Sequence, residues 1–516
     1  MKIMKYFGLM MSFAFILTGT FMLSGCNASN FDTDKLSIVK EFTYDGNSHI
    51  LEIAYEDVDL NVTYSTTLDG EYKPASEFAY KNAGEYELYY KISASGYNDY
   101  VCSEPVKFEI EKRTVTVNVD NVNKMYKDRA KADFGMIAPE NNAEDVVIGE
   151  DDLNLSFAIG NKAGTQTAFV ASNVAAGDKY DIVATYDNDN YDVTFKKGQV
   201  LIKGAIEIAN PGEDVRYIDS IDEAALYADL EKGAVITLYE DFEYQAGAVT
   251  GDDIRLTAAA GTDYVFTIDL NGHNVGYRFT FTNFVSKGNY TGGKINATIK
   301  NGNIGDDTNI TYGLTVFGNG DVEVKMENLN VVSSYYGFSG NGNCDGAKVS
   351  AEDCMFHGIE AGAYTPSRYT YAWENCSFVG RTGYYAKSGY HTLTNCDLRG
   401  NKTTYQEPTY NGNGTDATGS AIVIDSAEGY MIPMNVTLDG CTFNSIAGYC
   451  IEEFSTVSSG DENCYAHIQV INPNYGTRGQ SWRVFSENHS TASPIIEGVA
   501  TNHMLAPNLD KPNDDQ

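Results

Sequence analysis

Six side chains in the C-terminal half of the sequence have types and spacing that could do chemistry. They are two tyrosines, one lysine and three carboxylates: Tyr364, Tyr385, Lys387, Asp425, Glu452 and Glu453. A tyrosine offers a flat apolar face with a polar tip, which suits sugar rings, and carboxylates suit hydroxyl groups or calcium. A lysine could serve as a base, and two carboxylates about 5–5.5 Å apart could hydrolyse a glycosidic bond. Whether these groups meet depends on the elements that carry them.

One local pattern recurs through this part of the chain. It reads MENLNV (326–331), AEDCMF (351–356), WENCSF (373–378), LTNCDL (393–398) and LDGCTF (438–443). Its cysteines are 22 residues apart (376 − 354) and 20 apart (396 − 376), and then 45 apart (441 − 396), which we interpret as about two units. A period of 20–25 residues indicates a solenoid of stacked repeats.

Each repeat also contains an earlier strand that follows a glycine, at Gly337, Gly362, Gly383 and Gly448. Alignment on these glycines predicts outward positions for both tyrosines, Lys387 and Glu452, with Asp425 and Glu453 at the strand ends. Stacked repeats would gather the six side chains into one exposed ligand-binding patch. An ordinary solvated strand face is the alternative.

The repeats, together with the stretch FTIDLNGHNV (266–275), resemble the right-handed parallel β-helix of the pectate-lyase-like superfamily. The resemblance predicts roughly eight coils within residues 205–500, followed by a loose tail at 501–516. Asn328, Asp353, Asn375 and Asn395 would occupy left-handed corners, which Asn and Asp tolerate. The stretch SIDEAALYADLEKG (220–233) has the capping box Ser220-x-x-Glu223 and predicts a short helix that caps the first coil.

The cysteines Cys354, Cys376, Cys396 and Cys441 follow the corners, where an interior row needs small apolar residues. A buried free cysteine behaves as a small hydrophobe, so we expect core packing. Disulfides and metal binding are the alternatives.

Residues 36–112 and 113–204 form a tandem duplication. Gly84 matches Gly177 with an offset of 93 (177 − 84), and Ile110 matches Ile202 with an offset of 92 (202 − 110). The set FTYDGNSH, AGEY, GYNDY and FEI resembles bacterial Ig-like modules of the MBG/YDG type. That resemblance implies two β-sandwich spacers without catalytic residues. The whole chain is therefore expected to be all-β: two Ig-like modules, then the capped β-helix.

The N-terminus combines Lys2 and Lys5 with an apolar stretch that ends in Leu23-Ser24-Gly25-Cys26. This resembles a bacterial lipobox, which implies a signal peptide at 1–25, acylation of Cys26 and a tether at 26–35. The expected location is the bacterial cell surface, with the lipid as the membrane contact. An uncleaved anchor or an ordinary signal peptide is the alternative.

The chain has 36 basic and 71 acidic residues among 516, a net charge of −35. This excludes nucleic acid as a partner, because nucleic-acid binding requires basic surface. Two functions remain: a surface protein that binds an extracellular glycan or surface protein, and a polysaccharide lyase or hydrolase. We favour binding, because Lys387 has no second basic residue in its row, although Arg368, Arg381 and Arg399 in nearby loops leave the enzyme open. No cofactor is expected, and calcium is possible.

Overall fold

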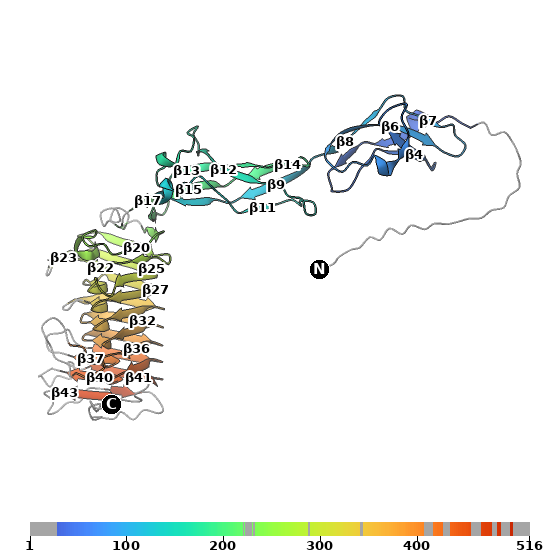
Figure 1. Cartoon of the computed structure of the whole chain (residues 1–516). Coiled ribbons are helices and arrows are strands. Elements are labelled where there is room, and N and C mark those ends of the chain that lie inside the picture. The colour runs from blue at the N-terminus through green and yellow to red at the C-terminus, as the bar shows by residue number, and fades with distance from the viewer. Residues whose placement is uncertain are drawn as a thin grey trace. The chain divides into compact units, whose positions relative to one another are not determined.

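The computed structural model describes residues 28–219, 221, 230, 233–286, 289–340, 344–406, 416–426, 434–455, 466–476, 482–486 and 496–498. These residues are almost entirely β-strands and loops (Figure 1), as expected for an all-β chain. Cys26 and the expected signal peptide, most of the expected capping helix at 220–233 and the expected tail at 501–516 lie outside the described residues.

The chain divides into two compact units. Unit 1 comprises residues 1–121, 138–158 and 182–198, and unit 2 comprises residues 122–137, 159–181 and 199–516. Each sheet nevertheless draws its strands from one of the three predicted segments, 36–112, 113–204 or 205–500.

The first segment contains a two-stranded sheet, β1-β3, and a six-stranded sheet, β2-β8-β6-β4-β5 with β7 paired to β6. Its elements are β1 (Leu36–Val39), β2 (Glu41–Thr43), β3 (Glu52–Tyr55), β4 (Asn61–Ser65), β5 (Lys73–Pro74), η2 (Ala75–Glu77), β6 (Gly84–Ser93), β7 (Tyr100–Val101) and β8 (Val106–Glu111), and η1 (Thr33–Lys35) directly precedes them.

The second segment contains the sheets β10-β15-β13-β12 and β11-β9-β14. Its elements are β9 (Arg113–Val119), β10 (Val122–Met125), η3 (Tyr126–Ala130), β11 (Asn141–Ala143), β12 (Ser156–Lys162), η4 (Ala171–Asn173), β13 (Lys179–Thr185), β14 (Tyr191–Lys196) and β15 (Gln199–Lys203).

The duplication is visible in the backbone pairing. Gly84 lies opposite Ile110 in the β6–β8 pair, and Gly177 donates its N–H to the carbonyl of Ile202 at 2.7 Å. In both segments the strand that carries this isoleucine also pairs in parallel with an early strand, β2–β8 in the first and β10–β15 in the second. The equivalent residues found in the sequence therefore make equivalent contacts.

Residues 205–498, here called the coiled domain, contain two long sheets. The nine-stranded sheet consists of β19 (Asp253–Thr257), β22 (Arg278–Thr282), β26 (Tyr312–Phe317), β28 (Tyr336–Gly340), β31 (Ala361–Thr365), β34 (Thr382–Ala386), β37 (Ile422–Ser426), β40 (Ile451–Ser455) and β43 (Trp482–Ser486). Every successive pair in it is parallel.

The second sheet has 18 strands. They are β16 (Ile206–Ala209), β17 (Arg216–Ile218), β18 (Val235–Leu238), β20 (Asp263–Asp269), β21 (Asn274–Val275), β25 (Lys294–Asp306), β27 (Val322–Ser333), β29 (Asp345–Glu352), β30 (Met355–Gly358), β32 (Arg368–Glu374), β33 (Ser377–Gly380), β35 (Gly389–Thr394), β36 (Asp397–Gly400), β38 (Met434–Asp439), β39 (Thr442–Ser445), β41 (Ala466–Ile471), β42 (Asn474–Tyr475) and β44 (Ile496–Gly498). The small elements η6 (Thr250–Asp252), β23 (Phe284–Ser286) and β24 (Asn289–Tyr290) lie outside both sheets.

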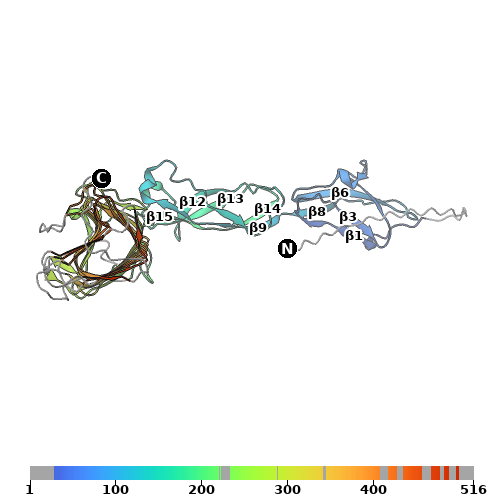
Figure 2. The same ribbon diagram turned by 90° about the horizontal axis from the view of Figure 1, so that it is seen from below.

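The chain alternates between these two sheets. It passes from β34 to β35 and β36, and then begins the next round at β37, which pairs in parallel with β34. Figure 2 shows the strands of the coiled domain around one shared interior, and a single hydrophobic cluster extends from Ala205 to Val470. This arrangement is consistent with a parallel β-helix.

The predicted corners are confirmed. Asn328, Asp353, Asn375 and Asn395 have φ angles of 50°, 54°, 52° and 53°. A non-glycine residue is strained in this left-handed region unless, like Asn or Asp, it can bond locally. Asp353, Asn375 and Asn395 lie between two strands, whereas Asn328 lies inside β27, and in the coil after Asn395 the same place is taken by Gly440 with φ of 65°.

The predicted cysteine row is also confirmed. Cys354, Cys376, Cys396 and Cys441 are free thiols, each at most 2% exposed. The residues after Cys376, Cys396 and Cys441 each donate an N–H at 2.8 Å to the carbonyl of the preceding cysteine in the row, which places all four cysteines on consecutive coils. The thiol of Cys376 contacts the carbonyl of Glu374 at 3.2 Å, so the row is not purely apolar.

Two expectations about the repeat are wrong. The 45-residue interval is a single coil with insertions, because β36 pairs directly with β39. Gly448 is also out of line with the other glycines, because Ile422 pairs with Ile451 and places Cys450 beside Ala421. The glycine requirement is real at Gly362, where a Cβ would lie 2.5 Å from the backbone nitrogen of Val379.

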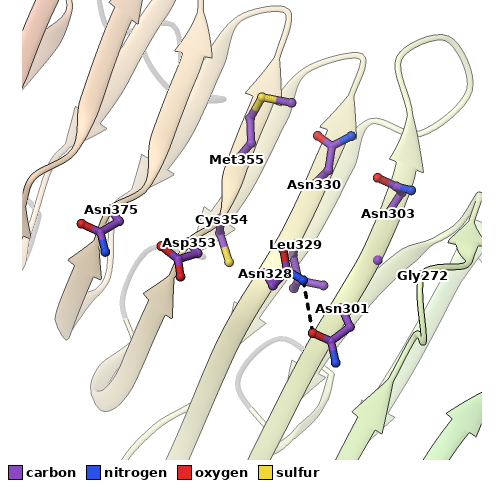
Figure 3. Close-up of a pocket in the computed structure, with 11 residues that line it drawn as sticks. Gly272, Asn301, Asn303, Asn328, Leu329, Asn330, Asp353, Cys354, Met355 and Asn375 are labelled. Carbon is purple, nitrogen blue, oxygen red and sulfur yellow. Dashed lines mark hydrogen bonds between the residues drawn. The ribbon is translucent and has the colours of Figure 1, made fainter.

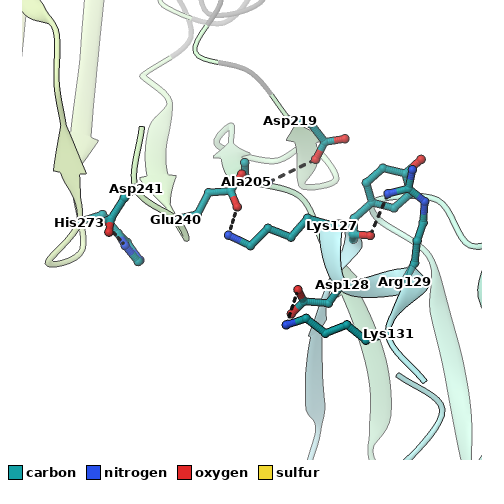
Figure 4. A network of polar contacts seen from close by, with 10 residues as sticks. Lys127, Asp128, Arg129, Lys131, Ala205, Asp219, Glu240, Asp241 and His273 are labelled. Atoms are coloured by element: carbon teal, nitrogen blue, oxygen red, sulfur yellow. Dashed lines mark hydrogen bonds and ion pairs between the residues drawn. The ribbon is translucent and has the colours of Figure 1, made fainter. Parts of the chain in front are cut away.

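Polar contacts near the first coils lie within unit 2 (Figure 4). Lys127 forms an ion pair with Glu240, and the Nδ1 atom of His273 lies 3.0 Å from the carboxylate of Asp241. Partly exposed contacts of this kind contribute about 0–1 kcal/mol each. We therefore expect these contacts to contribute little to the stability of the unit.

A polar chain runs through the interior of the coiled domain. Trp373 donates to the hydroxyl of Tyr384 at 3.0 Å, that hydroxyl lies 2.8 Å from Nδ1 of His391, and Nε2 of His391 lies 2.7 Å from the carbonyl of Ser388. A carbonyl only accepts, so Nε2 carries the proton and Nδ1 accepts from Tyr384. The ring of Tyr371 stacks on His391 at 4.7 Å. Burial lowers the pKa of His391 to about 4.

The lowered pKa of His391 predicts loss of stability in acid. Above about pH 6.5 the imidazole is neutral in both states, and below it the unfolded chain binds a proton that the folded chain cannot. The free energy of unfolding should fall by about 1.4 kcal/mol per pH unit until the pH reaches the folded pKa near 4. Urea unfolding followed by tryptophan fluorescence measures this slope.

The matched variant is His391→Gln, which keeps a donor for the carbonyl of Ser388 but does not titrate. Its unfolding free energy should be lower at neutral pH and should change less as the pH falls. Equal pH slopes in the two proteins would contradict the assignment.

Candidate functional site

The six candidate residues do not form an exposed patch. They lie on or beside β31, β34, β37 and β40 of the nine-stranded sheet, and each is between 0% and 7% exposed. Lys387, Asp425 and Glu452 are among the most buried charged residues described. The expected accessible surface is therefore wrong, although the strands and their order were predicted.

The inward and outward assignment is correct for most of the six. Tyr384 belongs to the main interior cluster, whereas its neighbour Tyr385 packs with Tyr336, Tyr364 and Val423 in a separate cluster. Tyr385 pairs with Val423, which pairs with Glu452, so these three share the outer face.

Glu453 is the exception. It pairs with Ile424, which belongs to the interior cluster, so Glu453 occupies an inward position. The two-residue misalignment of Gly448 did not cause this error, since an even shift preserves the face. Placing Glu453 and Glu452 on one face ignored the alternation of strand side chains.

An ion pair joins three of the outer-face residues. Nζ of Lys387 lies 3.1 Å from Oδ2 of Asp425, and the hydroxyl of Tyr385 donates to the same oxygen at 3.1 Å. Nζ also lies 5.7 Å from the centre of the Tyr385 ring. The lysine and aspartate thus bind each other away from solvent, where such a pair is stable only with good geometry and further hydrogen bonds.

The second carboxylate, Glu452, is held by the segment that follows β36. Tyr405 donates to Oε1 of Glu452 at 2.5 Å, and Ser420 donates to Oε2 at 2.7 Å. Lys402 donates to the carbonyl of Ala417 at 2.7 Å, which ties the two described ends of this insertion together. The insertion that lengthens the repeat to 45 residues therefore contributes contacts over the outer face.

Because of these contacts, the six residues are not available for the expected base catalysis or ligand stacking. A buried base paired with a carboxylate is not available to a polymer, and the tyrosine rings pack on each other, Tyr336 and Tyr364 at 4.7 Å. The three arginines that supported the alternative enzyme function form ion pairs: Arg368 with Asp345, Arg381 with Glu360 and Arg399 with Asp397.

An open groove of about 560 Å³ lies at the corners of five successive coils (Figure 3). We call it the corner groove. Its lining is Gly272, Asn301, Gly302, Asn303, Asn328, Leu329, Asn330, Asp353, Cys354, Met355 and Asn375. The side chains of Leu329 and Cys354 are buried in the interior. The backbone at these positions therefore forms the floor between two rows of outward side chains.

The two rows are mostly amides. The corner row contains Asn301, Asn328 and Asn375, and the second row, two residues later, contains Asn303 and Asn330. Asn328 donates to Asn301 at 3.3 Å. Sequence reasoning assigned the corner row a backbone role and missed the second row, which the repeated Asn-x-Asn of KNGNI (300–304) and ENLNV (327–331) could have shown.

Within the described residues, no group of three or more His, Cys, Asp or Glu side chains is placed to hold a metal ion. Likewise, none of the helices in the described part of the chain is both long and apolar enough to cross a membrane. Comparison of the chain with protein-family models, curated proteins and solved structures found no match.

The ion pair predicts a large effect of Lys387→Met on stability. The substitution keeps the length of the side chain but leaves the carboxylate of Asp425 buried without the ammonium group. Breaking a buried pair in this way costs about 3–5 kcal/mol, whereas replacing both partners by apolar residues is often neutral. Lys387→Met should therefore lower the free energy of unfolding, and Lys387→Met/Asp425→Leu should recover most of it.

The control is Lys348→Met, which removes an ion pair with Glu323 whose side chains are 67% and 54% exposed. That change should cost about 0–1 kcal/mol in the same urea titration. A loss at Lys387 no larger than the loss at Lys348 would show that the buried pair is unimportant.

Proposed function

We propose that the chain is a bacterial surface lipoprotein that binds an extracellular glycan or surface protein and does not turn it over. The sequence Leu23-Ser24-Gly25-Cys26 supports a lipid on Cys26. Two Ig-like modules at 36–112 and 113–204 would act as spacers, and a right-handed β-helix, closed by the capping helix, would carry the binding surface. The net charge of −35 favours neutral or basic ligands.

One observation carries the preference for binding: the groups best suited to catalysis are buried, while the corner groove is open. Lys387 and Asp425 are 1% and 2% exposed and lie 3.1 Å apart, so they offer a substrate neither a free base nor a free acid. Amides, in contrast, bind hydroxyl groups and have no useful acid–base chemistry. A lyase or hydrolase would need residues other than the six expected ones.

Acylation of Cys26 predicts the behaviour of Cys26→Ala. Without the thiol no lipid can be attached, so the variant should leave the detergent phase and appear in the soluble fraction or as an unprocessed precursor. Detergent partitioning of cells that express each form measures this. Unchanged membrane retention with normal processing would overturn lipid anchoring through this residue.

Binding without turnover predicts the outcome of a glycan array probed with the mature chain, with and without calcium. We expect at least one retained glycan, and no shortening of that glycan on prolonged incubation. Cleavage of a bound polysaccharide by the purified wild type would establish the enzyme instead. Retention that requires calcium would assign calcium to the bound complex.

A further inference from the structure

The second row of the corner groove is not explained by the fold. Asn301 and Asn328 have φ angles of 59° and 50°, which favour asparagine. Asn303 and Asn330 lie inside β25 and β27 and are not among the residues with positive φ. Asparagine is depleted in strands because its side chain competes for the backbone. Its presence two residues after two successive corners indicates a requirement at the surface.

The amides at one end of the groove are already engaged. Asn301 donates to Asp269 at 3.1 Å and accepts from Asn328, and Asn303 donates to Asn274 at 2.6 Å. Such bonds hold the amides in fixed orientations, which lowers the ordering cost of binding.

The other end has unused capacity. For Asn330, Asp353 and Asn375, the described structure contains no side-chain hydrogen bond, and Oδ1 of Asn330 is shielded from solvent without a partner. An unpaired shielded acceptor is unfavourable, and a small turn of the amide would let a ligand donor satisfy it.

The lining selects a ligand class. Asp353 is the one charged residue among the eleven that line the groove, and no cation is among them. A polyanion therefore has no counter-charge here. Each amide presents both a donor and an acceptor, as a sugar hydroxyl does, and Met355, 40% exposed, offers an apolar contact for a ring face.

The rows also set the shape of the ligand. Parallel strands stack about 4.8 Å apart, so from Asn301 to Asn375 the groove presents a polar side chain at that interval, an amide on three of these coils and the carboxylate of Asp353 on the other. An extended polymer that lies along the coil axis can repeat its contacts, whereas a compact small molecule meets one coil or two.

We infer that the corner groove binds a neutral, linear polysaccharide through its two rows of asparagine amides. This inference rests on the proposed function and assigns its site and ligand class.

The test uses the triple variant Asn328→Gly/Asn330→Ala/Asn375→Gly. Glycine takes the left-handed corner without strain, as Gly440 does with φ of 65° at the equivalent corner, and Asn330 has ordinary strand geometry. The matched control is Asn271→Gly/Asn395→Gly, which changes two corners with φ of 50° and 53° that do not line the groove. Circular dichroism and thermal unfolding check that both variants fold alike.

The probes are cellohexaose, xylohexaose and mannohexaose as neutral chains and oligogalacturonate as the anionic chain, titrated calorimetrically into the mature protein. We expect the wild type and control to bind a neutral chain, and the triple variant to bind it about tenfold more weakly or less. Equal affinity of the triple variant and wild type, or wild-type binding of oligogalacturonate alone, overturns the inference but leaves the proposed function standing. Failure of the wild type to bind any neutral probe also overturns the inference. Failure to bind any arrayed glycan as well overturns the glycan part of the proposed function and leaves a surface protein as the ligand.

Discussion

Parallel pairing in register between successive coils is the constraint on which the coiled domain depends. The strand pairs β30–β33, β33–β36 and β36–β39 repeat the same alignment, so one position of the coil is occupied by a row of residues in identical surroundings. A row can tolerate only side chains that suit its place. Corners need a left-handed backbone, inward rows need apolar side chains of limited size, and outward rows are restricted only by their neighbours.

The same constraint makes buried polar groups possible here. Tyr384, His391 and Trp373 bond to one another inside the coil because rigid strands fix their separations. On the outer face, Lys387 meets Asp425 of the next coil in the same manner. A shift of one residue between these strands would exchange their faces and separate the charges. The polar contacts thus favour a single strand register. Apolar rows alone discriminate less strongly between alternative registers.

The periodic part of the structure could be predicted from the sequence, and the part without periodicity could not. Asn375 and Cys376 have counterparts of the same kind on neighbouring coils, so their corner and interior places follow from the spacing. The burial of Tyr385 does not, because alternation identifies the face of a strand and says nothing of what packs on that face. Tyr405, which binds Glu452, lies in an insertion whose only trace in the sequence is the lengthened interval between Cys396 and Cys441.

That insertion also explains why the expected and the observed candidate surfaces differ. Once side chains such as Tyr405 contact a face, its charged residues must be paired, and the face becomes a second core. A corner is different. It is only one or two residues long, and its side chains point away from the coil, so the described residues of the insertion do not cover them. From Asn301 to Asn375 the corner groove presents an amide or a carboxylate on each successive coil. In the described part of the coiled domain, the repeated corners form a continuous row of hydrogen-bonding groups that a ligand can contact. The repeated strands β31, β34, β37 and β40 instead form a second buried layer on their outer face.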